Sequence, residues 1–181
     1  LPVKEILTNI PRKHYKLDSV RITDWENTIN LSSSLFNDYL MEVLKLPSVA
    51  CKHFLTSKVD RSVTGLIAQQ QCLGPLHIPV ADNFIIADSY FNKTGVVSSI
   101  GEQPLKGLYN SKNGVAMSIG EMLTNMISSV ITDIKDIRCS GNWMWANDDN
   151  DNKYRLYDAS REVSKLLQIL GFAIDGGKDS L

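Results

Sequence analysis

Glu121 and Asn125 stand four residues apart in a stretch, residues 111–134, whose apolar residues recur at helical spacing. On a helix, side chains four apart project side by side from adjacent turns. A carboxylate oxygen and an amide oxygen so arranged can share a hard cation such as magnesium, which keeps waters and substrate phosphates as its other ligands. The alternative is that Glu121 joins a local hydrogen-bond network against another domain. The spacing alone leaves both interpretations open.

The helix predicted over 111–134 has an unusual polar side. Its apolar residues form one stripe on a helical wheel and are expected to face the core. This stripe consists of Ile119, Leu123, Met126, Ile127, Val130, Ile131 and Ile134. The opposite side carries small polar residues, and Glu121 is the only charged residue between Lys112 and Asp133. Such a surface is poorly suited to water, so it favours a binding role.

Asp82 offers a third oxygen ligand. It follows the segment Ile78-Pro79-Val80-Ala81 and immediately precedes an apolar run. A carboxylate before a strand is commonly a turn-forming residue, so Asp82 alone indicates little. Together, Asp82, Glu121 and Asn125 form a plausible magnesium constellation.

Composition excludes several classes of protein. The 181 residues carry a formal net charge of −1, with scattered Lys and Arg, which argues against a nucleic-acid or membrane-surface partner. We find no apolar run of roughly 20 residues to cross a bilayer and no signal peptide at the start. The three cysteines are widely spaced and form no CxxC pair, which favours a reducing compartment and a cytoplasmic location.

The elements that must position the candidate ligands are predicted from hydrophobic spacing and from residues that begin or end helices. Helices are predicted over 35–46 with Ser34 as N-cap, over 111–134, and over 154–170 with Gly171 at its end. Strands are predicted over 63–68, 83–91, 94–100 and 137–145, with a last strand beginning at 172. Turns or loops are expected at 92–93, 101–107 and 147–153. This order predicts an α+β fold, a mixed or antiparallel sheet with helices packed on one face.

The ends of the chain suggest a piece of something longer. Residues 1–33 are polar and weakly patterned, as in a connecting segment. The last residues, DGGKDSL, are expected to begin a loop at Gly176, Gly177 and Lys178. GKDS does not have the spacing of a Walker phosphate loop.

Several long strings resemble the synthetase region of phosphoribosylformylglycinamidine synthase of the long, single-chain kind. They are, in chain order, KVDRSVTGLIAQQQCLGPLHIPVAD, GEQPLKGL, GEMLTN, CSGNWMWA and DGGKDSL. The match runs from about Leu46 to Leu181, and the AQQQCLGP and GNWMWA spellings look like the animal versions. The resemblance implies an ATP-dependent ligase of purine biosynthesis, which converts formylglycinamide ribonucleotide to the amidine with ammonia released from glutamine.

The same resemblance implies a domain organisation. Residues 47–181 look like the N-terminal-like subdomain, of the aminoimidazole-ribonucleotide-synthetase type, in the second of two homologous halves, truncated at the C-terminus. Residues 1–46 look like a connecting segment and helix from the preceding half. The implied partners are the remaining synthetase halves, a glutaminase domain on the same chain and the ribonucleotide substrate. The isolated piece is expected to be inactive, because it has no Gly-x-Cys-x-Gly glutaminase motif.

Site residues follow from the resemblance position by position. Asp82, Glu121 and Asn125 match magnesium ligands at a nucleotide phosphate site, so ATP or ADP and Mg²⁺ are the implied cofactors. The remaining matched residues lie beside the nucleotide or the substrate cleft: Ala81, Lys52, Lys178 and Asp179. An alternative is that this half holds a nucleotide that does not turn over and stabilises the fold. Gln69, Gln70 and Gln71 either contact substrate or the other half, or bond to neighbouring loops.

Overall fold

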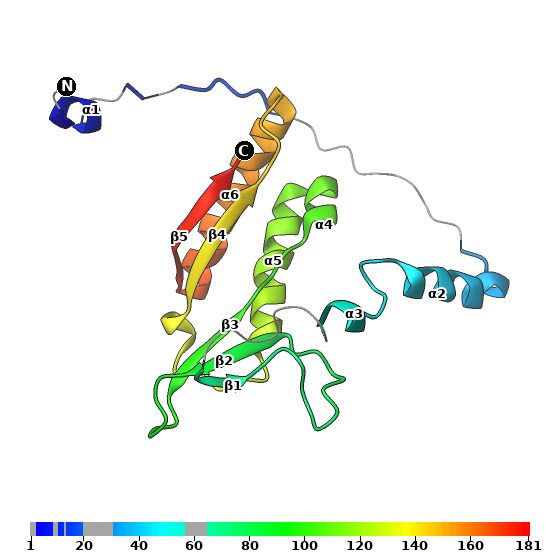
Figure 1. Ribbon diagram of the computed structural model, residues 1–181. Coiled ribbons are helices and arrows are strands. Elements are labelled where there is room, and N and C mark those ends of the chain that lie inside the picture. The colour runs from blue at the N-terminus through cyan, green and yellow to red at the C-terminus, as the bar shows by residue number, and fades with distance from the viewer. Residues whose placement is uncertain (1–2, 9–10, 13, 20–30, 57–64) are drawn as a thin grey trace.

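The computed structural model describes residues 3–8, 11–12, 14–19, 31–56 and 65–181. The N-terminal elements are α1 (Val3–Thr8), the 3₁₀ helix η1 (Ser33–Leu35), α2 (Phe36–Lys45) and α3 (His53–Thr56). Figure 1 shows α1 and α2 apart from the main body, which is built from five strands and the helices α4, α5 and α6. Within the described residues, none of the helices combines the length and the apolar character needed to span a bilayer.

The helix predicted over 35–46 is confirmed as α2, but its predicted N-cap is wrong. Leu35 occupies the N-cap position, and Ser34 lies one residue earlier, in η1. The hydroxyl of Ser34 hydrogen-bonds to that of Ser32 at 2.7 Å, so it is engaged before the helix starts.

An antiparallel sheet is formed by β1 (Ile67–Gln69), β2 (Asn83–Ala87) and β3 (Gly95–Ser99), in that order. The ladder between β2 and β3 runs from the pair Asn83 and Ser99 to the pair Ala87 and Gly95. The predicted strands are confirmed but shorter, because the turn occupies residues 88–94 and not just 92–93. The predicted strand 63–68 overlaps β1, and its first two residues lie outside the described part.

A second, parallel pair consists of β4 (Arg138–Met144) and β5 (Ala173–Ser180), connected by α6 (Asn150–Leu170). The α+β class and the antiparallel sheet fit the structure, but the single sheet expected from the sequence is two sheets. The loop expected at 176–178 is also wrong, because these residues are in β5. Gly141 and Gly177 are partners in the ladder, and a Cβ at Gly177 would lie 2.1 Å from the Gly141 carbonyl oxygen, so two glycines allow the strands to approach.

The segment 101–107, expected to be a turn, contains most of helix α4 (Pro104–Tyr109), which begins with a proline suited to the first helical turn. Helix α5 (Ser111–Met126) follows at once, with Asn110 as its N-cap. The two helices cross at glycines, because a Cβ at Gly114 would lie 2.5 Å from Cα of Gly107.

Helix α5 ends at Met126, eight residues before the predicted end. The second half of the predicted core stripe is therefore wrong: Ile127 is 84% exposed and Val130 is fully exposed. Residues 128–132 are serine or β-branched, which are weak helix formers. Asp133 then starts the 3₁₀ helix η2 (Ile134–Asp136) by accepting a hydrogen bond from the Lys135 N–H.

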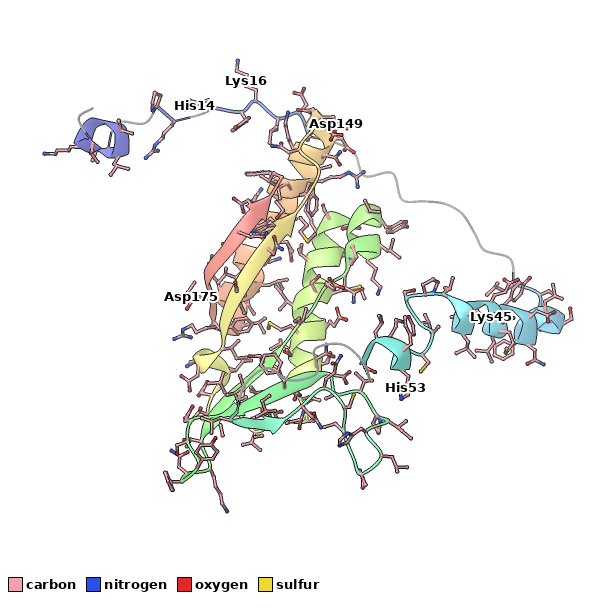
Figure 2. The ribbon with its side chains drawn as sticks, viewed as in Figure 1. His14, Lys16, Lys45, His53, Asp149 and Asp175 are labelled. Atoms are coloured by element: carbon pink, nitrogen blue, oxygen red, sulfur yellow. The ribbon has the colours of Figure 1, made fainter. Side chains whose placement is uncertain are left out.

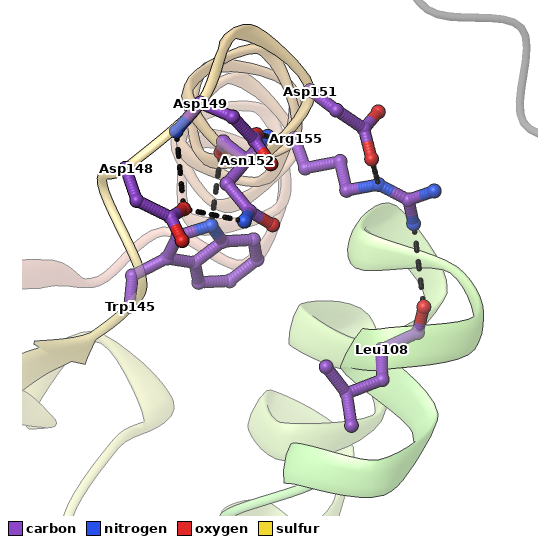
Figure 3. A network of polar contacts seen from close by, with 7 residues as sticks. All are labelled: Leu108, Trp145, Asp148, Asp149, Asp151, Asn152 and Arg155. Atoms are coloured by element: carbon purple, nitrogen blue, oxygen red, sulfur yellow. Dashed lines mark hydrogen bonds and ion pairs between the residues drawn. The ribbon is translucent and has the colours of Figure 1, made fainter.

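Helix α6 begins four residues earlier than predicted, because the Asp149 carboxylate caps it by accepting from the Asn152 N–H at 2.7 Å (Figure 3). The predicted loop 147–153 thus contributes the first helical turn. Its predicted end is confirmed, with Gly171 in the left-handed conformation at φ 80°. Core side chains on and around α6 include Ile137, Ala159, Val163 and Phe172, so this helix packs over the β4–β5 pair.

Candidate metal site

Asp82 lies at the open end of the β2–β3 ladder. Asn83 and Ser99 form the first pair of that ladder; Asp82 immediately precedes Asn83, and Ile100 immediately follows Ser99. The side-chain amide of Asn125 donates to the Ile100 carbonyl at 2.9 Å. Asn125 is therefore held against the residue that follows Ser99, the ladder partner of Asn83.

Glu121 is anchored on the same segment, one helical turn before Asn125. Its Oε2 atom accepts hydrogen bonds from the backbone N–H of Glu102 and from the side-chain amide of Gln103, both at 2.8 Å. Lys106 in turn donates to the Gln103 side-chain oxygen. The residues that leave β3 thus fix both candidate ligands of α5.

The remaining oxygens are suited to a hard cation. The hydrogen bonds just described use Oε2 of Glu121 and the amide nitrogen of Asn125, so they orient both side chains without using Oε1 of Glu121 or the Asn125 amide oxygen. With the exposed Asp82 carboxylate, these groups are the oxygen donors that magnesium takes.

The candidate ligands are two carboxylates and one amide. Across the described ranges, no three His, Cys, Asp or Glu side chains gather where they could hold a metal ion. Two carboxylates and one amide suit magnesium, which commonly keeps waters and substrate phosphates as ligands. The donor set fits a cation bound together with a phosphate.

Asn83 joins this end of the sheet to α5, and the sequence reasoning missed it. Its side chain is buried, accepts from the Gln69 amide at 2.6 Å, and donates to the Asn125 carbonyl at 2.7 Å and to the Ser128 hydroxyl at 3.2 Å. The signal available in the sequence was an asparagine at the head of an otherwise apolar run. Gln69 therefore bonds within the domain, as one of the two interpretations of the glutamines expected.

A paired stem delivers Asp82 to the ladder. The Ala81 N–H donates to the Gln71 carbonyl at 2.7 Å, and Cys72 bridges Val80 in antiparallel fashion. Cys72 is buried, and its thiol donates to the Thr56 carbonyl of α3 at 3.6 Å. The stem and α3 are thus linked.

Lys52 lies immediately before α3, but it is not directed to the three ligands by any hydrogen bond described for it. Its ammonium donates to the Ala50 carbonyl at 2.5 Å, so it folds back on its own segment. Figure 2 shows the next residue, His53, on the α3 side of the molecule, near the end of the β1–β3 sheet.

Lys178 and Asp179 are not brought together with Asp82. Both are exposed on β5, opposite Asn142 and Trp143 of β4, and they line a pocket of about 320 Å³. The three candidate metal ligands belong instead to α5 and to the end of the antiparallel sheet. The structure describes two separate places for the residues that the sequence grouped.

The chain is similar to known proteins along its whole length. A family model described as the FGAR-AT PurM_N-like domain matches residues 51–181. The phosphoribosylformylglycinamidine synthase of Dictyostelium discoideum is 46% identical over 100% of this chain and 14% of the relative. The protein of that name from Homo sapiens is 42% identical over 100% of this chain and 14% of the relative. A probable phosphoribosylformylglycinamidine synthase of Caenorhabditis elegans is 54% identical over 78% of this chain and 11% of the relative. The chain therefore spans about a seventh of the length of such relatives.

Proposed function

The chain belongs to the phosphoribosylformylglycinamidine synthase family, in which it matches the FGAR-AT PurM_N-like domain, and we propose from this that it is the N-terminal-like subdomain of the second synthetase half of such an enzyme. Residues 47–181 would form that subdomain, and residues 1–46 the connection and helix from the preceding half. The match over 51–181 supports this boundary.

The proposed reaction is the ATP- and glutamine-dependent conversion of formylglycinamide ribonucleotide to the amidine in purine biosynthesis. In this enzyme the chain provides ligands for a nucleotide phosphate and its magnesium ion. A bound magnesium would neutralise charge on the phosphate groups. Asp82, Glu121 and Asn125 would hold the ion, and Ala81 and Lys52 would adjoin the nucleotide. Lys178 and Asp179 would contact the substrate from β5.

One observation carries the proposal. Asn125 is bonded to the carbonyl of Ile100, which follows the ladder partner of Asn83, and Glu121 is bonded to the residues that follow Ile100. Two oxygen donors of one helix are thereby held by one segment, and the salt bridges described include neither of them nor Asp82.

A structural nucleotide is the second candidate function. Glu121 and Asn125 bond α5 to the residues that follow β3, so a ligand bound to these two side chains would also strengthen the contact between α5 and that segment. A ligand that binds only the folded state stabilises it by RT ln(1 + [L]/Kd), which grows as the free ligand concentration exceeds Kd. In this case the bound nucleotide would not turn over.

Partners and compartment follow as parts of the same proposal. The relatives are about seven times longer, which leaves room in one polypeptide for the other synthetase half and a glutaminase domain. Cys51, Cys72 and Cys139 are free thiols, which agrees with a reducing compartment such as the cytoplasm.

The test is a Glu121→Ala substitution in the full-length enzyme, with Thr124→Ala, an exposed change on the same helix, as its control. Turnover, bound nucleotide and magnesium per chain, and the melting temperature with and without EDTA would be measured. Lost turnover with an unchanged melting temperature indicates a catalytic site. A melting temperature that falls with loss of bound nucleotide indicates a structural site. Retention of all metal and nucleotide would show that the residue assignment is wrong.

A further inference from the structure

We propose that Asn83 is the positioning residue that holds the strand ligand Asp82 and the helix ligand Asn125 in register and so sets the magnesium affinity of the site. The inference rests on the proposed function, because it takes Asp82 and Asn125 as ligands. It concerns a residue that touches no ion itself.

The side chain of Asn83 is fully used by the protein. An asparagine amide offers two N–H donors and one carbonyl acceptor. Here the two donors go to Asn125 and Ser128, and the acceptor receives Gln69. With 5% of its surface exposed, Asn83 is a buried polar group, which costs stability unless its bonds are made. Such a group specifies one arrangement of the elements that it joins.

The elements it joins are those that carry the ligands. Asn83 follows Asp82 directly in the chain, and its amide nitrogen lies 2.7 Å from the carbonyl oxygen of Asn125. On the other side, the Asn125 side chain is bonded to Ile100, next to Ser99, the ladder partner of Asn83. The backbone of Asn125 is thus held by Asn83 of β2, and its side chain is held by Ile100, which follows β3.

The carbonyl of Asn125 is available because α5 ends there. The last four carbonyls of a helix have no donor within the helix, and α5 stops at Met126. Asn83 supplies the missing donor, and the nearby Ser99 hydroxyl likewise donates to the Met122 carbonyl at 2.8 Å. Contacts with the sheet therefore fix the end of α5. They also fix the rotation of α5 about its axis, which determines where Glu121 and Asn125 point.

The test measures metal binding separately from folding. Full-length enzyme with saturating ADP would be titrated with Mn²⁺ while free Mn²⁺ is followed by electron paramagnetic resonance, and melting temperature would be recorded in EDTA. Asn83→Leu removes the bonds at similar volume. Ser128→Ala is the matched control, because it removes one partner of Asn83 but keeps the bond to Asn125. Glu121→Ala tests the underlying site.

We expect Asn83→Leu to weaken one Mn²⁺ site roughly tenfold, as for other residues that orient metal ligands, and Ser128→Ala to leave it within about twofold. Higher Mn²⁺ should restore occupancy in Asn83→Leu. If the leucine variant does not fold, Asn83→Thr, which keeps one donor, should weaken the site by more than Ser128→Ala does and by less than roughly tenfold. If the Asn83 variants bind Mn²⁺ as tightly as wild type, even with a lower melting temperature in EDTA, then Asn83 stabilises the fold but does not position the metal ligands. Unchanged Mn²⁺ binding in Glu121→Ala would instead overturn the proposed site.

Discussion

Gln103 donates from its side-chain amide to Oε2 of Glu121 at 2.8 Å, and the backbone N–H of Glu102 donates to the same oxygen. Both donors come from the segment between β3 and α4, and Lys106 of α4 bonds the far end of the Gln103 side chain. Two contacts from the segment before α4 therefore orient this carboxylate, and a third, from Lys106, holds Gln103 in place.

Replacing Gln103 by Leu should weaken magnesium binding roughly tenfold at the proposed site, because residues that orient metal ligands typically contribute that much. The measurement is the same Mn²⁺ titration of the full-length enzyme. Gln168→Leu is the control: Gln168 is an exposed glutamine of α6 that bonds Ser164. Equal Mn²⁺ affinity in both variants would show that the Glu102 N–H is sufficient to orient Glu121.

Two glycines of α5 should respond oppositely to alanine. A Cβ at Gly114 would lie 2.5 Å and 2.6 Å from backbone atoms of Gly107, so Gly114→Ala must push α4 away from α5. A Cβ at Gly120 meets nothing within 4 Å, and alanine is favoured over glycine in a helix by about 0.5–1 kcal/mol.

The comparison is made by native-state hydrogen exchange of the α5 amides. We expect faster exchange in Gly114→Ala and slower exchange in Gly120→Ala. Similar protection in the two variants would mean that α4 yields easily, and it would contradict the close crossing of the helices.

The positions of several helices and strands were predictable from the sequence, but the division of the strands into two sheets was not. The pairing of β2 with β3 and the end of α6 at Gly171 follow from residues within a few positions. The separation of β4–β5 from the antiparallel sheet depends on which strands pair, and strand composition does not encode that. The end of α5 was missed because apolar spacing continued after the serines at 128 and 129, where helix propensity had already fallen.

The candidate site divides in the same way. The four-residue spacing of Glu121 and Asn125 predicted their common side of a helix, and the structure bears this out through their bonds to one segment. Asn83 and Gln103 could not be assigned from spacing, because their partners are 42 and 18 residues away in the chain. Lys178 was named as a candidate from the family resemblance, as a residue near the substrate cleft, and the structure places its strand in the other sheet.

Removing Lys112 of α5 should cost more stability than removing Asp158 of α6, although the two form one ion pair. The two charged atoms are 3.2 Å apart, with 9% of the Asp158 side chain exposed against 47% of that of Lys112. Lys112→Ala leaves a buried carboxylate without its partner, whereas Asp158→Asn leaves an ammonium that water can reach. We expect the first to cost about 1–3 kcal/mol and the second less, after allowing for the exposure of the lysine.

A double-mutant cycle tests this asymmetry. Hydrogen exchange of the α5 and α6 amides would be measured in both single variants and in Lys112→Ala/Asp158→Asn. The double variant should recover most of the protection lost in Lys112→Ala, because the buried charge is gone. Additive losses would indicate that the pair contributes through packing alone.

Protonation of Asp148 should loosen the first turn of α6. The Oδ1 atom of Asp148 accepts hydrogen bonds from the Asn152 side-chain amide at 2.8 Å and from the Asp149 N–H at 3.0 Å (Figure 3). Because these bonds favour the charged carboxylate, they hold the pKa of Asp148 below its ordinary value of 3.8. A carboxyl whose pKa is lower in the folded state than in the unfolded state stabilises the folded state. This stabilisation is fully present above the pKa of the unfolded state, and it is lost as the pH falls through the pKa of the folded state. In hydrogen exchange, corrected for the intrinsic pH dependence, Asp148→Asn should therefore expose the α6 N-terminus relative to wild type at pH 6. The difference should shrink as the pH falls through the lowered pKa of Asp148 in the folded state. Asp88→Asn, in the turn between β2 and β3, should match wild type throughout. A difference between wild type and Asp148→Asn that stays constant down to the acid limit of folding would show that the charge of Asp148 does not hold the helix start.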